Sequence, residues 1–181
     1  MDEIFNNEIA KQVTSAILNK CFSPIISKTT DKFKTLYNEA KIYLEIPFQD
    51  YLTNSYKKYS KIKTIIYGIE PKRLYDFFEV PFLEKGSDII KPTTTRVLTD
   101  ISKFLIIEGT GGIGKSTLMK HLFLSELELK DYIPIFIELK DFNEEEHLDL
   151  EQLLLKKLNQ FHNTFKEEYL DYALQSGCFL F

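Results

Sequence analysis

A glycine-rich run that follows an apolar segment constrains this chain more than any other feature. Residues 109–117 read G-T-G-G-I-G-K-S-T, and the apolar run 104–107 precedes them. They fit the pattern G-x-x-x-x-G-K-[ST]. Glycines permit a tight turn whose backbone N–H groups point at one phosphate, and the dipole of a following helix adds positive potential. The pattern therefore predicts a loop that binds the phosphates of a nucleotide.

The segments on either side of this loop favour the same interpretation. Residues 103–108, which contain the apolar run 104–107, predict a strand. After the loop, apolar residues recur at helical spacing and predict a helix from Lys115 to about Leu129. Lys115 would then reach the β- and γ-phosphates, and Ser116 would offer its hydroxyl to Mg²⁺. The alternative is an ordinary glycine-rich turn between a strand and a helix.

The sequence before residue 101 divides into two parts. Residues 1–66 have helical spacing of apolar residues, with a break expected at Pro24 and an end or kink expected at Pro47. Residues 67–100 contain several glycines and prolines, so we expect a linker of extended or turning chain. The first part carries no catalytic constellation, and its aromatic residues are typical of a core or a partner surface.

Residues 101–181 alternate between strand and helix patterns. Besides the strand at 103–108, strands are expected at 132–140 and from Cys178 onward, with two helices between them. Alternating strands and helices predict an α/β fold, here a partial parallel sheet with flanking helices that follows a helical N-terminal region.

Charge and composition limit the functions to be considered. The net charge is −4, which does not favour a dedicated nucleic-acid binder. A lysine cluster at 57–63 is interpreted as a solvated face. No apolar stretch approaches the length of a membrane span and no signal peptide begins the chain, so we expect a cytoplasmic protein without membrane contact.

The cysteines and histidines indicate no metal site and no disulfide framework. Cys21 and Cys178 lie far apart in the sequence and form no C-x-x-C motif. His121, His147 and His162 lie on unrelated segments without the spacing of metal ligands, and we interpret them as surface or boundary residues.

Four segments resemble the NACHT family of P-loop ATPases. The loop 109–117 resembles the NACHT form of the phosphate loop, and 133–142 is similar to the apolar strand that follows the first helix. Residues 174–181 resemble the approach to the Walker B strand. Residues 74–82 resemble the segment that precedes many bacterial NACHT domains, where a Tyr-Val-Pro-like turn lies near the adenine. Here Glu79 stands in place of the aromatic residue before Val-Pro. The resemblance covers about residues 70–181.

This resemblance implies a nucleotide switch that binds ATP or ADP with Mg²⁺. Family members act in signal transduction, and bacterial members often act in defence against phage. A closed monomer with ADP and an open homo-oligomer with ATP are implied for the full-length form. The implied site comprises Gly109, Thr110, Gly111, Gly112, Ile113, Gly114, Lys115, Ser116 and Thr117 around the phosphates, with Val80 and Pro81 near the adenine. Lys115 is the implied catalytic residue, and Ser116 is the implied magnesium ligand.

One departure from the family changes what is expected of this chain. No D-x-x-D-E-like cluster follows an apolar strand, and the acidic run 144–146 lies in a predicted loop. Mg²⁺ and the attacking water would lack their usual carboxylates. We therefore expect an N-terminal fragment of a longer protein, ending just before Walker B, that binds nucleotide without hydrolysing it.

Two other functions remain open from the sequence. A small-molecule or nucleotide kinase would have about this length, but such kinases place the phosphate loop near the N-terminus and follow it with an arginine-rich lid. Here the loop begins at Gly109, and no arginine follows Arg96. The other alternative is a non-enzymatic role in which residues 1–66 serve as a helical adaptor or oligomerisation module.

Overall fold

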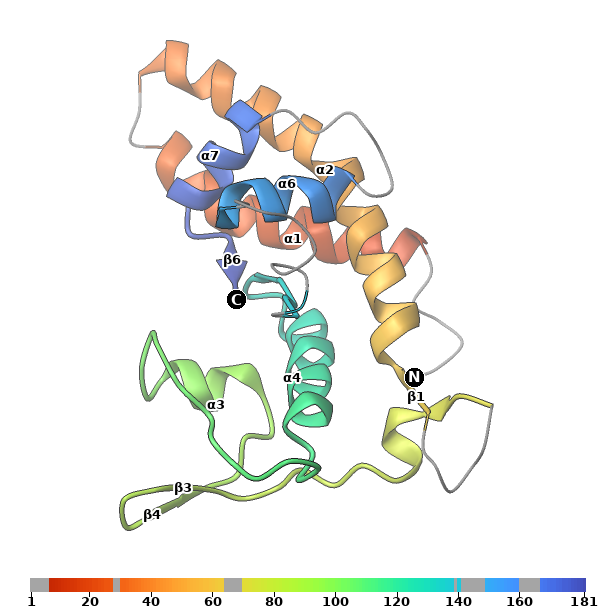
Figure 1. Ribbon diagram of the computed structural model, residues 1–181. Helices are drawn as coiled ribbons and strands as arrows, with labels where there is room; N and C mark the ends of the chain where they lie inside the picture. The colour runs from red at the N-terminus through yellow and green to blue at the C-terminus, as the bar shows by residue number, and fades with distance from the viewer. Residues whose placement is uncertain (1–6, 28–29, 64–69, 139, 141–148, 160–166) are drawn as a thin grey trace. The chain divides into compact units, whose positions relative to one another are not determined.

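The computed structural model is mixed α and β over the residues it describes (Figure 1). These are residues 7–27, 30–63, 70–138, 140, 149–159 and 167–181. Within the chain, contacts group residues 1–55 with 130–181 as one compact unit and residues 56–129 as a second. The sequence segments 1–66, 67–100 and 101–181 do not follow this grouping, and their division into domains stays a prediction.

Two long helices begin the first unit. α1 spans Asn7–Ile26, and α2 spans Asp31–Tyr59, whose last residues belong to the second unit. Buried residues recur every three or four positions on each helix, as expected where one apolar face packs. They are Ala10, Val13, Ile17, Leu18 and Phe22 on α1, and Tyr37, Ala40, Leu44, Phe48, Tyr51 and Leu52 on α2. The rings of Phe22 and Tyr37 meet edge to face, with centroids 5.6 Å apart.

Neither proline interrupts its helix at its own position, so the break expected at Pro24 and the helix end expected as one of two outcomes at Pro47 are wrong. Pro24 lies inside the last turns of α1, and Pro47 lies inside the 29-residue helix α2. A proline within a helix removes one hydrogen bond and costs about 3 kcal/mol. Leu44 and Phe48, on either side of Pro47, are fully buried. Burying such side chains stabilises by about 1.5–3 kcal/mol each, which offsets the loss at the proline.

A parallel strand pair with a helical connection completes the first unit. β5 spans Ile133–Pro134 and β6 spans Phe179–Leu180, in the register Ile133↔Phe179 and Pro134↔Leu180. The connection contains α6, Leu150–Asn159, and α7, Glu167–Gln175. The expected third strand is confirmed as β6, whereas β5 is much shorter than the strand expected over 132–140. The N–H groups of Ile133 and Ile135 donate to Cys178 and Leu180, so this pairing needs no donor from Pro134.

A glycine-based cap ends α7 and directs the chain into β6. Gly177 has φ of 68°, in the left-handed region. Its N–H donates to the Leu174 carbonyl at 3.0 Å, and the Cys178 N–H donates to the Ala173 carbonyl at 3.3 Å. These two bonds form a Schellman motif. The motif sets both the end of the helix and the position of Cys178.

The second unit combines two antiparallel hairpins with helices. β1, Lys61–Ile62, pairs with β2, Lys72–Arg73, and a 3-10 helix η1 follows at Leu74–Asp76. β3, Leu83–Lys85, pairs with β4, Asp88–Ile90. The helices are α3, Thr95–Thr99, and α4, Lys115–Leu129. The helix expected from Lys115 to about Leu129 is therefore confirmed.

α4 supplies most of the core of this unit. Leu118 and Leu122 are buried with Leu98 of α3. Partly buried residues pack around them: Phe78, Leu83, Ile101, Ile107 and Met119. The Tyr59 and Phe123 rings meet edge to face at a centroid distance of 5.0 Å. The glycine-rich loop therefore leads into a helix, α4, whose position is fixed by packing along its length.

Candidate functional site: the glycine-rich loop

The glycine-rich loop lies in the second unit and leads directly into α4. Two of its residues have positive φ, Gly112 at 82° and Gly114 at 98°. A Cβ atom added at either position would meet no atom within 4 Å. Glycine is therefore required here by the backbone conformation rather than by lack of space. The sequence places glycine at both of the positions where the loop turns left-handed.

Gly109 is constrained in a different way. A Cβ atom there would lie 3.1 Å from Cγ2 of Ile113, inside ordinary contact distance. Ile113 itself is 65% exposed, and its N–H points to the Thr110 carbonyl at 3.5 Å. The loop thus closes on itself at its first residue, which brings its start near the beginning of α4.

Lys115 is the first residue of α4, and its ammonium group folds back over the loop. Nζ donates to the carbonyl oxygen of Gly109 at 2.6 Å and to that of Thr110 at 2.9 Å. An ammonium group has three donors, and these contacts use two of them. The positive charge is therefore held on the loop by neutral acceptors, over the residues that the sequence predicts to surround a phosphate.

The first turn of α4 presents the remaining predicted residues. The Leu118 N–H donates to the Gly114 carbonyl at 2.9 Å, so regular helical bonding begins there. N–H groups that precede the first such bond have no partner within the helix and carry the positive end of its dipole. They belong to Lys115, Ser116 and Thr117. Ser116 is exposed, so its hydroxyl is accessible.

The strand expected at 103–108 is not formed in the described structure. Phe104 and Ile106 are 90% and 88% exposed, and Ile107 is the one described residue of this segment that packs on the core cluster of Leu98, Leu118 and Leu122. A strand requires a neighbour to bond its backbone, and among the described residues none pairs with this segment. The strand expected before the loop, and its pairing in a sheet, are therefore absent from the described residues.

Val80 and Pro81 lie between η1 and β3 and are partly buried. The contacts of the preceding residues reach the middle of α4 instead of the loop. The Phe78 ring lies 5.1 Å from the His121 ring, and the Tyr75 ring meets it edge to face at 5.8 Å. Tyr75 and Phe78 thus contact α4 just before the Val-Pro segment, while the adenine contact of Val80 and Pro81 stays a prediction.

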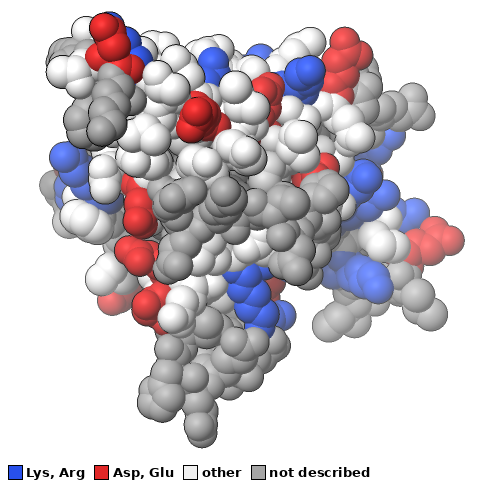
Figure 2. Space-filling model, turned by 90° about the horizontal axis from the view of Figure 1, so that it is seen from above, with Lys and Arg blue, Asp and Glu red and all other residues white. Residues whose placement is uncertain are grey.

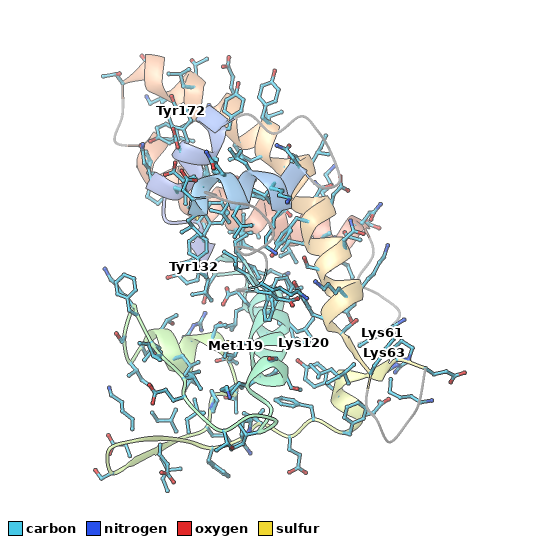
Figure 3. The ribbon with its side chains drawn as sticks, in the orientation of Figure 1. Lys61, Lys63, Met119, Lys120, Tyr132 and Tyr172 are labelled. Atoms are coloured by element: carbon cyan, nitrogen blue, oxygen red, sulfur yellow. The ribbon has the colours of Figure 1, made fainter. Side chains whose placement is uncertain are left out.

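His121 is buried, so its interpretation as a surface or boundary residue is wrong. Only 7% of it is exposed, and Figure 3 labels Met119 and Lys120 just before it on α4. Its Nε2 lies 3.1 Å from the Thr93 carbonyl, and its Nδ1 lies 3.1 Å from the Tyr75 hydroxyl. A carbonyl only accepts, so Nε2 carries the proton and Nδ1 accepts from Tyr75. The other two histidines, at 147 and 162, lie outside the described residues.

The surroundings of His121 favour its neutral form. Burial is the main cause and lowers its pKa below the usual 6.5, although the carbonyl of Thr93 and the carboxylate of Glu128 act in the opposite direction. The sequence contained a signal for this residue. Leu118, His121, Leu122 and Ser125 recur at helical spacing, which places His121 on the buried face of α4.

A second polar contact joins α4 to α3. The Thr95 hydroxyl donates to the Glu126 carboxylate, and the Thr95 N–H donates to the Ser125 hydroxyl at 3.3 Å. All three residues are buried. Because a buried polar group without a partner costs about 1–3 kcal/mol, these bonds favour one position of α3 on α4. Sequence reasoning did not single out this cluster.

The described residues add no acidic metal cluster to the loop. Among them, no group of three or more His, Cys, Asp or Glu side chains is placed to hold a metal ion. The acidic run 144–146 falls outside the described residues. On the face shown in Figure 2, acidic and basic side chains are interspersed. None of the described helices combines the length and apolar character needed to cross a membrane.

Comparisons of the chain with protein-family models, with characterised proteins and with solved structures give no match. The resemblance to the NACHT family therefore rests on the sequence motifs alone and stays a prediction.

Proposed function

We propose that this chain is the ATP-binding portion of a NACHT-type nucleotide switch, active in signalling or defence against phage. The observation that carries the proposal is the form of the loop. Gly112 and Gly114 occupy left-handed conformations, and the Lys115 ammonium lies over the carbonyls of Gly109 and Thr110. A loop of this composition and form suits a bound phosphate chain.

In this proposal the backbone N–H groups, Lys115 and Ser116 each have a defined role in binding the phosphates and Mg²⁺. The N–H groups from Gly112 to Thr117 donate to phosphate oxygens. Lys115 exchanges its two carbonyl acceptors for phosphate oxygens, because a hydrogen bond between charged groups is about twice as strong as a neutral one. Space for the phosphates is consistent with the open surroundings of Gly111, Gly112 and Gly114, where an added Cβ would meet no atom within 4 Å. Bound Mg²⁺ would neutralise phosphate charge, with the Ser116 hydroxyl as one ligand.

We further propose that the fold is a partial P-loop sheet with flanking helices. The parallel pair of β5 and β6, joined through α6 and α7, is a strand–helix–strand unit of the kind found in such sheets. The apolar run 104–107 has the composition of a strand buried on both faces. Its exposed Phe104 and Ile106 would be covered once a neighbouring strand pairs with it.

Binding without turnover is the expected activity of this chain. The sequence contains no D-x-x-D-E cluster after an apolar strand, so the carboxylates that usually orient Mg²⁺ and water are not supplied. The switch cycle, the homo-oligomer and the cytoplasmic signalling role belong to the proposal for the full-length protein.

The test is equilibrium dialysis with radiolabelled ATP and Mg²⁺. We expect weak, saturable binding that Lys115→Met reduces at least tenfold, since the variant removes the only charged group on the loop. Lys120→Met is the matched control, because it removes the same charge from the next turn of α4 and should change affinity less than twofold. Equal loss in both variants, or binding unaffected by Lys115→Met, would show that the loop does not hold the nucleotide.

Phosphate release tests the second part of the proposal. The wild-type chain should release no more phosphate from ATP than Lys115→Met does. Turnover at an ordinary enzyme rate that disappears in Lys115→Met would contradict binding without hydrolysis and leave the binding site itself intact.

A further inference from the structure

The lysine cluster at 57–63 is part of a larger basic patch in the second unit. Lys57 and Lys58 lie in the last turn of α2, Lys61 lies in β1, and Lys63 follows that strand. Figure 3 labels Lys61 and Lys63 near the end of α2. The structure adds Arg73 of β2, and all five residues are exposed. These five residues are called the basic patch below.

The hairpin of β1 and β2 places two of these cations directly opposite each other. Lys61 and Arg73 are register partners in the antiparallel pair, so their side chains leave the same face of the hairpin. Like charges in that position destabilise a hairpin. The Leu74 N–H donates to the Ser60 carbonyl at 2.8 Å, which ties the hairpin to the end of α2. The fold thus holds the cations together against a repulsion that a bound anion would relieve.

Neighbouring negative groups do not balance this charge. The carboxyl end of α2 carries about half a negative charge from the helix dipole, which Lys57 and Lys58 more than offset. The Glu70 carboxylate lies 3.7 Å from the ammonium group of Lys72, a lysine outside the basic patch. Residues 57–76 hold six Lys and Arg against two acidic residues, whereas the rest of the chain holds seventeen against twenty-five. Positive charge is therefore concentrated here on a chain that is acidic elsewhere.

Two exposed aromatic residues follow the basic patch along the chain. Tyr75 of η1 is 48% exposed, and Phe77 is 37% exposed. The Tyr75 hydroxyl lies 3.1 Å from Nδ1 of His121, and the two rings meet edge to face. Tyr75 is therefore held in a defined position while nearly half of it is open to solvent. An ordered, exposed ring beside cations offers a surface on which a nucleic-acid base can stack.

We propose that the basic patch and Tyr75 bind single-stranded nucleic acid. Lys61, Lys63 and Arg73 contact successive phosphates, and one base stacks on the Tyr75 ring. Cations along the backbone combined with an aromatic platform hold single strands with little sequence preference. The ordered ring favours this ligand over an anionic membrane, which the cations alone would attract. It also favours a single strand over a duplex, whose bases are already stacked on one another.

Fluorescence anisotropy of the full chain with a labelled single-stranded oligothymidine tests the proposal. The probe has about 20 nucleotides, and Mg²⁺ and ATP are left out so that the glycine-rich loop has no nucleotide ligand. Contacts to about four phosphates predict an affinity that falls about fiftyfold when salt rises from about 50 to about 200 mM. Absence of binding at the lower salt concentration, or binding that salt does not change, would overturn the proposal.

A double variant tests whether the basic patch is responsible for this binding. Lys61→Gln with Arg73→Gln should weaken binding about tenfold or more at low salt and roughly halve the salt dependence on a logarithmic scale. The variant removes a repulsion within the hairpin, so its fold is not put at risk. Lys85→Gln with Lys91→Gln is the matched control, because it removes two exposed lysines from the β3–β4 hairpin and the residue after it. Its affinity should change less than twofold, and equal losses in both double variants would overturn the proposal.

Two variants of Tyr75 test the stacking contact. Tyr75→Leu removes the ring and should lower the affinity about fivefold or more without changing the salt dependence. Tyr75→Phe keeps the ring and removes only the hydroxyl that meets His121, so it should bind within twofold of the wild type. Unchanged affinity in Tyr75→Leu, or equal losses in both variants, would refute the stacking role of the ring.

Other ligands and one loop variant complete the test. Tighter binding of a duplex of the same length would overturn the assignment to single strands. Sedimentation with phosphatidylserine vesicles by a chain that does not bind the oligonucleotide would assign the patch to a membrane instead. Lys115→Met should leave oligonucleotide binding unchanged, so this site and the nucleotide site of the loop can fail separately. Loss of oligonucleotide binding in Lys115→Met would place that binding at the loop and overturn the proposal.

Discussion

Replacing Gly177 with alanine tests how the end of α7 positions β6 and Cys178. Gly177 has φ of 68°, and an added Cβ atom would meet nothing within 4 Å. Steric conflict with neighbouring residues is therefore absent, and the cost comes from the backbone alone. A non-glycine residue in the left-handed region costs about 1–2 kcal/mol. For a chain of this size, that loss lowers the thermal midpoint by about 2–8 °C.

Differential scanning calorimetry at neutral pH measures this shift. Gly111→Ala is the matched control, because Gly111 has no left-handed φ and an added Cβ there also meets nothing within 4 Å. We expect its midpoint to change little. Gly177→Asn should lose less than Gly177→Ala, since asparagine tolerates the left-handed region better. Equal losses in Gly111→Ala and Gly177→Ala, or no loss in either, would refute the reasoning.

Two further predictions concern buried titratable groups. Because burial lowers the pKa of His121, the unfolded chain binds more protons below about pH 6.5, so stability should fall as pH falls from there. Urea unfolding at several pH values gives the slope of the unfolding free energy against pH, which should be smaller in His121→Gln. An unchanged slope would contradict the conclusion that the buried His121 ring is neutral. Burial raises the pKa of Tyr51 to about 12, and the Phe136 N–H donates to its hydroxyl at 3.2 Å. The unfolded phenol ionises near pH 10, so stability should fall by about 2–3 kcal/mol between pH 10 and 12. Tyr51→Phe should lack this component, and a fall of the same size in the variant would place its cause elsewhere.

The loop and its helix were predictable because their signals are local. Glycine is the residue that adopts positive φ readily, so the glycines at 112 and 114 predict the left-handed turns of the loop. The spacing of apolar residues predicts the helix that begins at Lys115. The hairpin of β3 and β4 also carried a local signal that was not used. Gly86 and Ser87 form a two-residue turn in which Gly86 has φ of 64°, as such hairpin turns require.

The misjudged features depend on tertiary packing. A proline predicts a helix end from local sterics, yet α2 continues through Pro47 because its neighbours are buried. Two apolar residues of that helix, Ile42 and Tyr43, are 68% and 51% exposed, so apolar character alone does not identify its buried face. A single sequence does not show which of several apolar faces meets the rest of the fold.

Contacts between distant segments could not be predicted either, because local sequence patterns do not show which segments pack together. Cys21 and Cys178 belong to one compact unit of the fold, although they lie near opposite ends of the sequence and no local pattern relates them. The apolar run 104–107 predicted a strand that the described structure does not form. A strand also needs a neighbouring strand to bond its backbone, and the local sequence pattern contains no information about that neighbour.

The central claim is that the backbone of the glycine-rich loop holds the phosphates of ATP. Two-dimensional amide NMR of the full chain, titrated with Mg²⁺ and ATP, tests it most directly and suits weak binding. We predict that the largest shift changes fall on the N–H groups of residues 112–117, and that Lys115→Met abolishes them while Lys120→Met preserves them. Changes concentrated elsewhere, or none at saturating ATP, would contradict the claim.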